Sequence, residues 1–271
     1  MPSMQTLVVA LLLTARARDD WIALYDECSY TDTGGERRDD AKYRLLKPHK
    51  IARNRKYPVV LFLHGKGGCG DDNRGQLVEY PTKLLAQPPF RQKYPCFVIA
   101  PQCPEGEHWW SPNPDEPSAP MRVAVAILDQ VLNTEPADPR RVYLTGLSMG
   151  GFGAWDAATR WPQRFAAVVP ICGGGDVSRA ERLVDVPIWA FHGDADDIVP
   201  VKQTTDMIAA IRDLGGKPKV TVLKGVGHNS WVPAYSDRQG VIPWMYKQVN
   251  HRADEGETDS ETKKQEEEAG N

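Results

Sequence analysis

Short, uninterrupted runs of apolar residues recur along this chain, and they constrain its fold more than any other feature. Such runs are expected to be β-strands that are buried on both faces, which occurs mainly in parallel sheets covered by helices. They lie at 59–63, 97–100, 142–145, 165–171, 187–193 and 219–223. Helical segments at 121–132, 151–160, 202–213 and 240–251 alternate with them. The alternation predicts an α/β fold with a mostly parallel central sheet flanked by helices.

The two ends of the chain differ from this pattern. Residues 21–30 and 41–46 read as two strands joined by a turn-rich segment, and we expect them to add an antiparallel pair to one edge of the sheet. The acidic, low-complexity segment 253–271 is expected to be disordered. Residues 1–17 read as a signal peptide or a disordered start. A catalytic domain is therefore predicted at 21–252.

Composition excludes several classes of function. The net charge is −3 and no dense stripe of Lys and Arg is present, so a nucleic-acid partner is not expected. The apolar run 7–13 is too short to span a membrane. It precedes an "ARA" sequence typical of signal-peptide cleavage but lacks a basic start, which leaves both export and a cytoplasmic location open. The oligomeric state is also left open.

The five cysteines predict neither a disulfide framework nor a zinc site. Their odd number leaves at least one unpaired within the chain. Cys96 and Cys103 flank an expected strand, which would separate them by roughly 20 Å, beyond disulfide reach. No cluster of Cys and His has the spacing of zinc ligands, so we predict no structural metal.

A G-x-S-x-G sequence at Gly146–Gly150 lies between a predicted strand and a predicted helix. In this context the motif forms a nucleophile elbow, in which a strained turn lifts the Ser148 hydroxyl above the end of the strand. The helix that follows begins with unpaired amides, which would stabilise an oxyanion. The alternative is a glycine-rich turn that only packs the helix against the strand.

A serine hydroxyl needs an adjacent base, and His228 is the candidate we favour. It stands in the glycine-flanked loop "KGVGHNSW" after the last predicted strand, whereas His64 and His192 end earlier strands. Three acids in "FHGDADDIVP" could orient its imidazole: Asp194, Asp196 and Asp197. We favour Asp196 and expect Asp194 to hold the turn, although spacing alone does not separate them. The order Ser, acid, His is that of α/β-hydrolases.

The segment "LFLHGKGGCGDDN" supplies a loop whose glycines let the backbone approach a substrate. An oxyanion hole needs two amides, and we predict those of Lys66 and Met149. A phosphate-binding loop is the competing interpretation, but the segment lacks the GxxxxGK[ST] order.

Together with "VIAPQCPEGEHWW", "DPRRVYLTGLSMGGFGAW", "FHGDADDIVPV" and "GVGHNSW", this segment resembles the α/β-hydrolase superfamily. The resemblance is closest to phospholipase/carboxylesterase and polyhydroxybutyrate-depolymerase-like esterases, which include predicted peptidases of the prolyl-oligopeptidase type. It spans roughly residues 25–251. It implies an α/β-hydrolase fold, a catalytic acid at Asp196 and a first oxyanion amide at Lys66, where a usually small residue is replaced.

The predicted function is that of a serine carboxylesterase acting without a cofactor. Three tryptophans fall in loops near the predicted site and are expected to bind an acyl or aryl group or to pack the loops: Trp109, Trp110 and Trp231. We see no long insertion that would form a lid over the site. An open site favours small or carbohydrate-linked esters over long-chain triglycerides. Two alternatives are considered. One is a serine peptidase, which would need room for a gating domain, and the other is a non-catalytic binding protein on the same fold.

Overall fold

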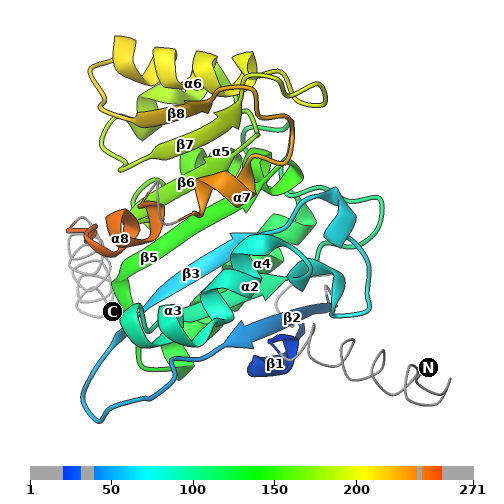
Figure 1. The fold of residues 1–271 in the computed structure, drawn as a ribbon, viewed down its shortest axis with the longest axis vertical. Helices are drawn as coiled ribbons and strands as arrows, with labels where there is room; N and C mark the ends of the chain where they lie inside the picture. Colours follow the sequence, from blue (N-terminus) through cyan, green and yellow to red (C-terminus); the bar gives the residue numbers. More distant parts are fainter. Residues whose placement is uncertain (1–20, 32–39, 237–239, 252–271) are drawn as a thin grey trace, which may run out of the picture.

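The structure is a computed structural model that describes residues 21–31, 40–236 and 240–251 (Figure 1). The predictions made for residues 1–17 and 253–271 lie outside the described residues.

In this part of the chain eight strands form one sheet, in the order β1-β2-β4-β3-β5-β6-β7-β8. The six strands from β4 to β8 in this order are mutually parallel, whereas β2 pairs antiparallel with both β1 and β4. The predicted parallel sheet and its antiparallel edge pair are thus confirmed. The strands are β1 (Tyr25–Thr31), β2 (Asp40–Leu46), β3 (Tyr57–Leu63), β4 (Phe97–Pro101), β5 (Ala137–Leu147), β6 (Ala167–Ile171), β7 (Trp189–Gly193) and β8 (Lys219–Leu223).

Helices cover both faces of the sheet. In Figure 1, α2, α3, α7 and α8 lie in front of it, while α4 and α5 lie behind. The α-helices are α2 (Tyr80–Ala86), α3 (Pro88–Lys93), α4 (Ala119–Thr134), α5 (Met149–Arg160), α6 (Lys202–Asp213), α7 (Trp231–Ala234) and α8 (Val241–Tyr246). The 3₁₀ helices are η1 (Ile22–Leu24), η2 (Lys66–Gly68), η3 (Gly75–Leu77) and η4 (Val177–Leu183).

The central strand β3 shows why its sequence is apolar at every position. All seven residues of β3 are buried. Val59, Leu61 and Leu63 belong to the core shared with α4, α5 and α6, whereas Val60 and Phe62 belong to the core shared with α2 and α8. Because successive side chains of a strand point to opposite faces, the two alternating sets of β3 side chains are each buried in one of these cores.

Several elements differ from the predictions. Helices α2 and α3 were not expected, because seven and six residues are too few to establish a helical period, although each has a proline in its first turn. Strand β5 begins at Ala137 rather than at 142, and the residues that follow Ala137 in this added part are partly or fully exposed. The last predicted helix ends at Tyr246.

The topology determines where a site can form. The chain passes from β3 to its neighbour β4 and then crosses to β5 on the other side of β3. In α/β sheets, such a reversal opens a crevice at the carboxyl ends of the two strands. Leu63 of β3 and Gly146 of β5 are paired in register, so the loops that follow these two strands begin side by side. None of the helices within the described ranges is both long enough and apolar enough to cross a membrane.

Candidate active site

Ser148 occupies the turn between β5 and α5. Its φ of 51° and ψ of −116° are unusual for a residue with a side chain. Two glycines make this turn possible, because a Cβ on Gly146 would lie 2.1 Å from the carbonyl oxygen of Gly150, and a Cβ on Gly150 would lie 1.9 Å from that of Leu63. The sequence Gly146–Gly150 therefore forms the strained strand-turn-helix that the motif predicts.

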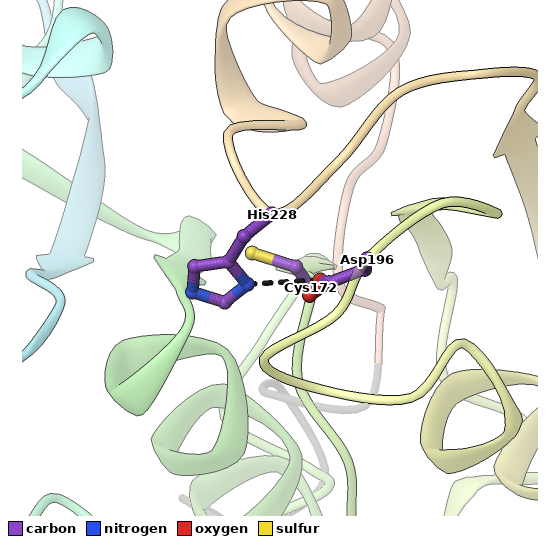
Figure 2. Close-up of side chains that lie close together, drawn as sticks. All are labelled: Cys172, Asp196 and His228. Carbon is purple, nitrogen blue, oxygen red and sulfur yellow. Dashed lines mark hydrogen bonds and ion pairs between the residues drawn. The ribbon is translucent and has the colours of Figure 1, made fainter.

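His228 connects Ser148 to Asp196. Its Nε2 lies 2.9 Å from the Ser148 Oγ, and its Nδ1 lies 2.8 Å from the Asp196 Oδ2, the second contact being drawn in Figure 2. A carboxylate can only accept, so Nδ1 carries the proton of the neutral ring and Nε2 is free to accept from the serine hydroxyl. The structure therefore brings together all three side chains in an arrangement that can take a proton from Ser148.

The structure also separates the three candidate acids. The Asp196 side chain is fully buried, and its Oδ1 accepts hydrogen bonds from the amides of Ile198 and Val199 at 3.0 and 2.9 Å. Asp194 is exposed, and its Oδ1 accepts from the Gly225 amide at 2.6 Å, so it joins two turns. Asp197 is exposed as well. Of these three acids, Asp196 is the one whose carboxylate contacts His228.

Asp196 is held as a carboxylate. Burial alone raises its pKa, but the hydrogen bonds from the Val199 amide, His228 and the Ile198 amide together outweigh burial, and the net pKa lies below its ordinary value. The acid is therefore ionised at neutral pH and can orient the imidazole and stabilise its protonated form.

A second histidine contacts the same carboxylate. The Nε2 of His192 lies 3.1 Å from the Asp196 Oδ2 and 2.9 Å from the Val199 carbonyl oxygen. Both neighbours are acceptors, so Nε2 carries a proton. Burial lowers the pKa of His192. Sequence reasoning missed this contact, because the only signal is the position of His192 at the end of β7, four residues before Asp196.

The two predicted oxyanion donors begin helices. The amides of Lys66 in η2 and Met149 in α5 lie in first turns, where an N–H has no acceptor within its own helix. Behind Lys66, the Cys103 amide donates to the His64 Nε2 at 2.9 Å, so His64 Nδ1 carries the proton and donates to the Gly65 carbonyl at 2.6 Å. In a planar trans peptide the C=O and N–H point in opposite directions, so the Lys66 amide points away from His64.

A buried histidine and a partly buried carboxyl group set the electrostatics behind this loop. Burial lowers the pKa of His64 to about 4, which keeps its ring neutral. Burial raises the pKa of Glu79 to about 7, partly offset by a hydrogen bond from the Gly65 amide to its carboxylate at 3.3 Å. Glu79 was missed by sequence reasoning because it precedes α2, a helix that the sequence pattern did not predict.

Cys172 lies beside the acid and the base, as Figure 2 shows. One donor atom each from Cys172, Asp196 and His228 lies within 4.8 Å of the others, a spacing compatible with a metal ion. However, burial raises the pKa of the Cys172 thiol to about 12, and Asp196 already accepts the His228 N–H. Because thiolates rather than thiols bind metals, this cluster is poorly suited to hold a cation.

Trp109 does not fit its predicted role in substrate binding. The side chain is fully buried, and its Nε1 donates to the His64 carbonyl at 3.0 Å. Its Cβ packs so closely against α5 that a Cβ on Gly153 would lie 2.4 Å away. A side chain without exposed surface cannot contact a substrate, so Trp109 belongs to the core and anchors its loop.

Trp110 and Trp231 are both partly exposed. Trp110 stacks on His108 with ring centroids 4.5 Å apart and lies 5.3 Å from Phe152, which is one turn after Ser148 on α5. The Trp231 ring meets the His228 ring edge-on at 5.7 Å. Trp231 thus lies beside His228, and Trp110 contacts the first turn of α5 through Phe152.

Similarity to known proteins agrees with this geometry. The chain is 28% identical over 185 residues to the putative esterase NocK of Nocardia uniformis subsp. tsuyamanensis, covering 65% of this chain and 51% of that protein. It is 37% identical over 90 residues to the bifunctional acetylxylan esterase/xylanase XynS20E of Neocallimastix patriciarum, covering 32% of this chain and 13% of that protein. The chain thus spans about half or less of the length of these relatives.

Among solved structures, a thermostable esterase superposes with a TM-score of 0.76 at 38% identity, over 83% of this chain and 63% of that one. The model of the dienelactone hydrolase family matches residues 112–256, more than half of the chain. This range contains Ser148, Asp196 and His228. The chain therefore belongs to the dienelactone hydrolase family, within the α/β-hydrolase superfamily.

Proposed function

We propose that this protein is a serine carboxylic-ester hydrolase that works through an acyl-enzyme, with residues 21–252 as its catalytic domain. The observation that carries the proposal is the hydrogen-bonded line from Ser148 through His228 to Asp196, with contacts of 2.9 and 2.8 Å. A serine hydroxyl becomes nucleophilic when a base lies within hydrogen-bonding distance and a third group orients that base.

In the first half of the reaction, Ser148 Oγ attacks the ester carbonyl carbon while His228 Nε2 takes the hydroxyl proton. The carbonyl oxygen becomes an oxyanion, which accepts hydrogen bonds from the amides of Lys66 and Met149. Asp196 stabilises the resulting imidazolium. The tetrahedral intermediate then breaks its bond to the alcohol oxygen, which leaves with the proton from His228, and an ester to Ser148 remains.

In the second half, water attacks the acyl carbon and gives a proton to His228 Nε2. A second oxyanion forms at the same two amides. Its collapse releases the carboxylic acid, and the proton returns to Ser148 Oγ. Every proton passes through one nitrogen, which is why the tautomer fixed by Asp196 matters for both halves.

Small or polysaccharide-linked esters are the substrates we propose. Similarity to proteins named as esterases, one of them a bifunctional acetylxylan esterase/xylanase, supports this class. Trp110 with Phe152, and Trp231 beside His228, offer aromatic surface on which an acyl group or a sugar ring can stack. Trp110 and Trp231 are the substrate contacts we retain.

Steady-state kinetics test the reaction class. Wild type should hydrolyse p-nitrophenyl acetate with a kcat/KM at least 100-fold above that for a peptide p-nitroanilide. Ser148→Ala should lower kcat by roughly 10⁴-fold or more, because the nucleophile is removed. Ser29→Ala, at an exposed position on the edge strand β1, is the matched control and should keep full activity. Faster cleavage of the anilide, or an active Ser148→Ala protein, would refute the proposal.

A further inference from the structure

Cys69 and Cys103 come from separate segments and meet behind the predicted oxyanion loop. Cys69 directly follows η2, and Cys103 lies two residues after the end of β4. Each thiol influences the pKa of the other, so the two side chains lie close together. The Gly70 amide also donates to the Cys103 carbonyl at 3.0 Å, so the main chains beside the two thiols are in contact.

The main-chain contact between Gly70 and Cys103 places Cys69 one residue from a direct neighbour of Cys103. A disulfide needs Cα atoms about 4.4–6.8 Å apart, and a direct main-chain hydrogen bond between neighbouring segments gives separations of that order. Both segments are also fixed in place. Cys103 donates its amide to His64, and the Gln102 side chain bridges the Gly68 carbonyl at 3.1 Å and the Asn73 amide at 2.7 Å. The bond can therefore form without large backbone movement.

The other three cysteines are placed differently. The Cys28 thiol interacts with Tyr43, and the Cys96 thiol interacts with Tyr246 at the opposite end of β4 from Cys103. Cys172 lies beside Asp196 and His228. The described contacts thus bring together a single pair of thiols.

We propose that Cys69 and Cys103 are a covalent modification site, at which a small-molecule disulfide of the glutathione type oxidises the two thiols to an intramolecular disulfide. The Cys69 thiolate attacks the oxidant and releases one reduced thiol, which leaves a mixed disulfide on Cys69. The Cys103 thiolate then displaces the second thiol. Two S–H groups are oxidised, one disulfide of the oxidant is reduced, and the two protons leave with the released thiols.

Exposure decides the order of these steps. Cys69 is partly exposed, whereas Cys103 is fully buried, so Cys69 meets the oxidant first. Burial raises the pKa of both thiols, and the nearby Glu105 carboxylate raises both further, while Lys66 partly offsets this at Cys69. Thiolate is therefore scarce at neutral pH, and exchange is expected to speed up as the pH rises towards 9.

The disulfide would tie the loop after β3 to the segment after β4. A cross-link between distant positions restricts the unfolded chain more than the folded one, and for a domain of this size it should raise Tm by about 5 °C or more. The Cys69 Sγ also lies 3.9 Å from the Met149 Sδ, so the link braces the loop beside both predicted oxyanion donors. This last consequence rests on the proposed function, whereas the bond itself does not.

The experiment uses the full chain, reduced and then incubated with oxidised glutathione at pH 8.5. Non-reducing peptide mapping should give one cross-linked species that contains Cys69 and Cys103, and titration should find three free thiols in place of five. The Tm should rise and return to its starting value after dithiothreitol is added. None of these readouts requires catalysis, so they stand or fall independently of esterase activity.

Variants provide the control. Cys69→Ser and Cys103→Ser should each abolish the cross-linked peptide and the Tm increase, whereas Cys28→Ser, at another partly exposed thiol, should oxidise as wild type does. A stable glutathione adduct on Cys69 with Cys103 still free would overturn the proposal, as would a cross-link that includes Cys28, Cys96 or Cys172. The wild-type peptide map distinguishes these outcomes even if a variant fails to fold.

Discussion

Two hydrogen bonds to one imidazole give Ser148 its proposed reactivity, and each depends on a single atom of a neighbouring side chain. Asp196 Oδ2 fixes the proton on His228 Nδ1, and this leaves Nε2 facing the serine hydroxyl. Asp196 Oδ1 is itself held by two backbone amides, so the acid cannot rotate away without losing both bonds. The neighbouring Asp194 is also a carboxylate, but it accepts a hydrogen bond from the Gly225 amide and so joins two turns.

Asp196→Asn should lower kcat by roughly 10⁴-fold while leaving KM for p-nitrophenyl acetate nearly unchanged. An amide in place of the carboxylate can favour the wrong imidazole tautomer and removes the charge that stabilises the imidazolium. Asp194→Asn is the matched control, because it changes the same residue type two positions away, and its kcat should fall less than tenfold. Equal losses in the two variants would show that Asp196 is not the acid of the site.

The sequence predicted these residues unevenly. Ser148 and His228 could be identified because a motif and a glycine-flanked loop mark them, whereas Asp196 needed the family resemblance to be separated from Asp194 and Asp197. For Trp109 the sequence left substrate binding and loop packing both open, because a loop position does not reveal that a ring is packed under the loop. Glu79 and His192 matter through contacts with Gly65 and Asp196, and contacts between distant segments have no local sequence pattern.

On the scale of secondary-structure elements, the site depends on how closely α5 approaches β3. The backbone of Gly150 touches the carbonyl oxygens at the end of β3, where a Cβ would lie 1.9 Å from that of Leu63 and 2.8 Å from that of His64. The long strands and helices of this region follow from the sequence pattern. The short helices α2, α3 and α7 do not, because tertiary contacts rather than a repeated pattern stabilise them.

Gly150→Ala should reduce kcat/KM more than 100-fold and destabilise the fold by about 1–3 kcal/mol, because α5 must move away from β3 to accommodate one methyl group. Gly67→Ala is the control for packing, since a Cβ there meets no protein atom within 4 Å and should leave the unfolding free energy unchanged. Esterase kinetics and urea unfolding measure both effects. Wild-type turnover in Gly150→Ala would mean that the turn does not have the tight geometry described.

At the scale of the whole molecule, the reversal of strand order between β4 and β5 gathers loops from across the chain at one edge of the sheet. Burying this edge has an electrostatic cost at Glu79, whose pKa of about 7 lies well above its ordinary value. Between pH 4.5 and 7 the folded protein holds a proton at Glu79 that the unfolded chain has released. Stability is therefore expected to fall as the pH rises through this interval.

Glu79→Gln should remove this dependence. The unfolding free energy of wild type, measured relative to that of the variant, should decrease between pH 4.5 and pH 7.5 by on the order of 2 kcal/mol, since each pKa unit corresponds to about 1.4 kcal/mol and residual exposure screens part of it. Glu116→Gln makes the same change at an exposed position, and the difference in unfolding free energy between wild type and this variant should stay constant over the same pH range. A difference between wild type and Glu79→Gln that is constant across this pH range would contradict the burial of this carboxyl.

The reactivity of Ser148 is tested most directly by covalent labelling with a fluorophosphonate, followed by intact-mass analysis and peptide mapping. We predict one adduct per chain, located on Ser148, with labelling slowed at least 100-fold in His228→Ala and absent in Ser148→Ala. An adduct on another residue, or equal labelling of wild type and Ser148→Ala, would contradict the claim that His228 and Asp196 activate this hydroxyl.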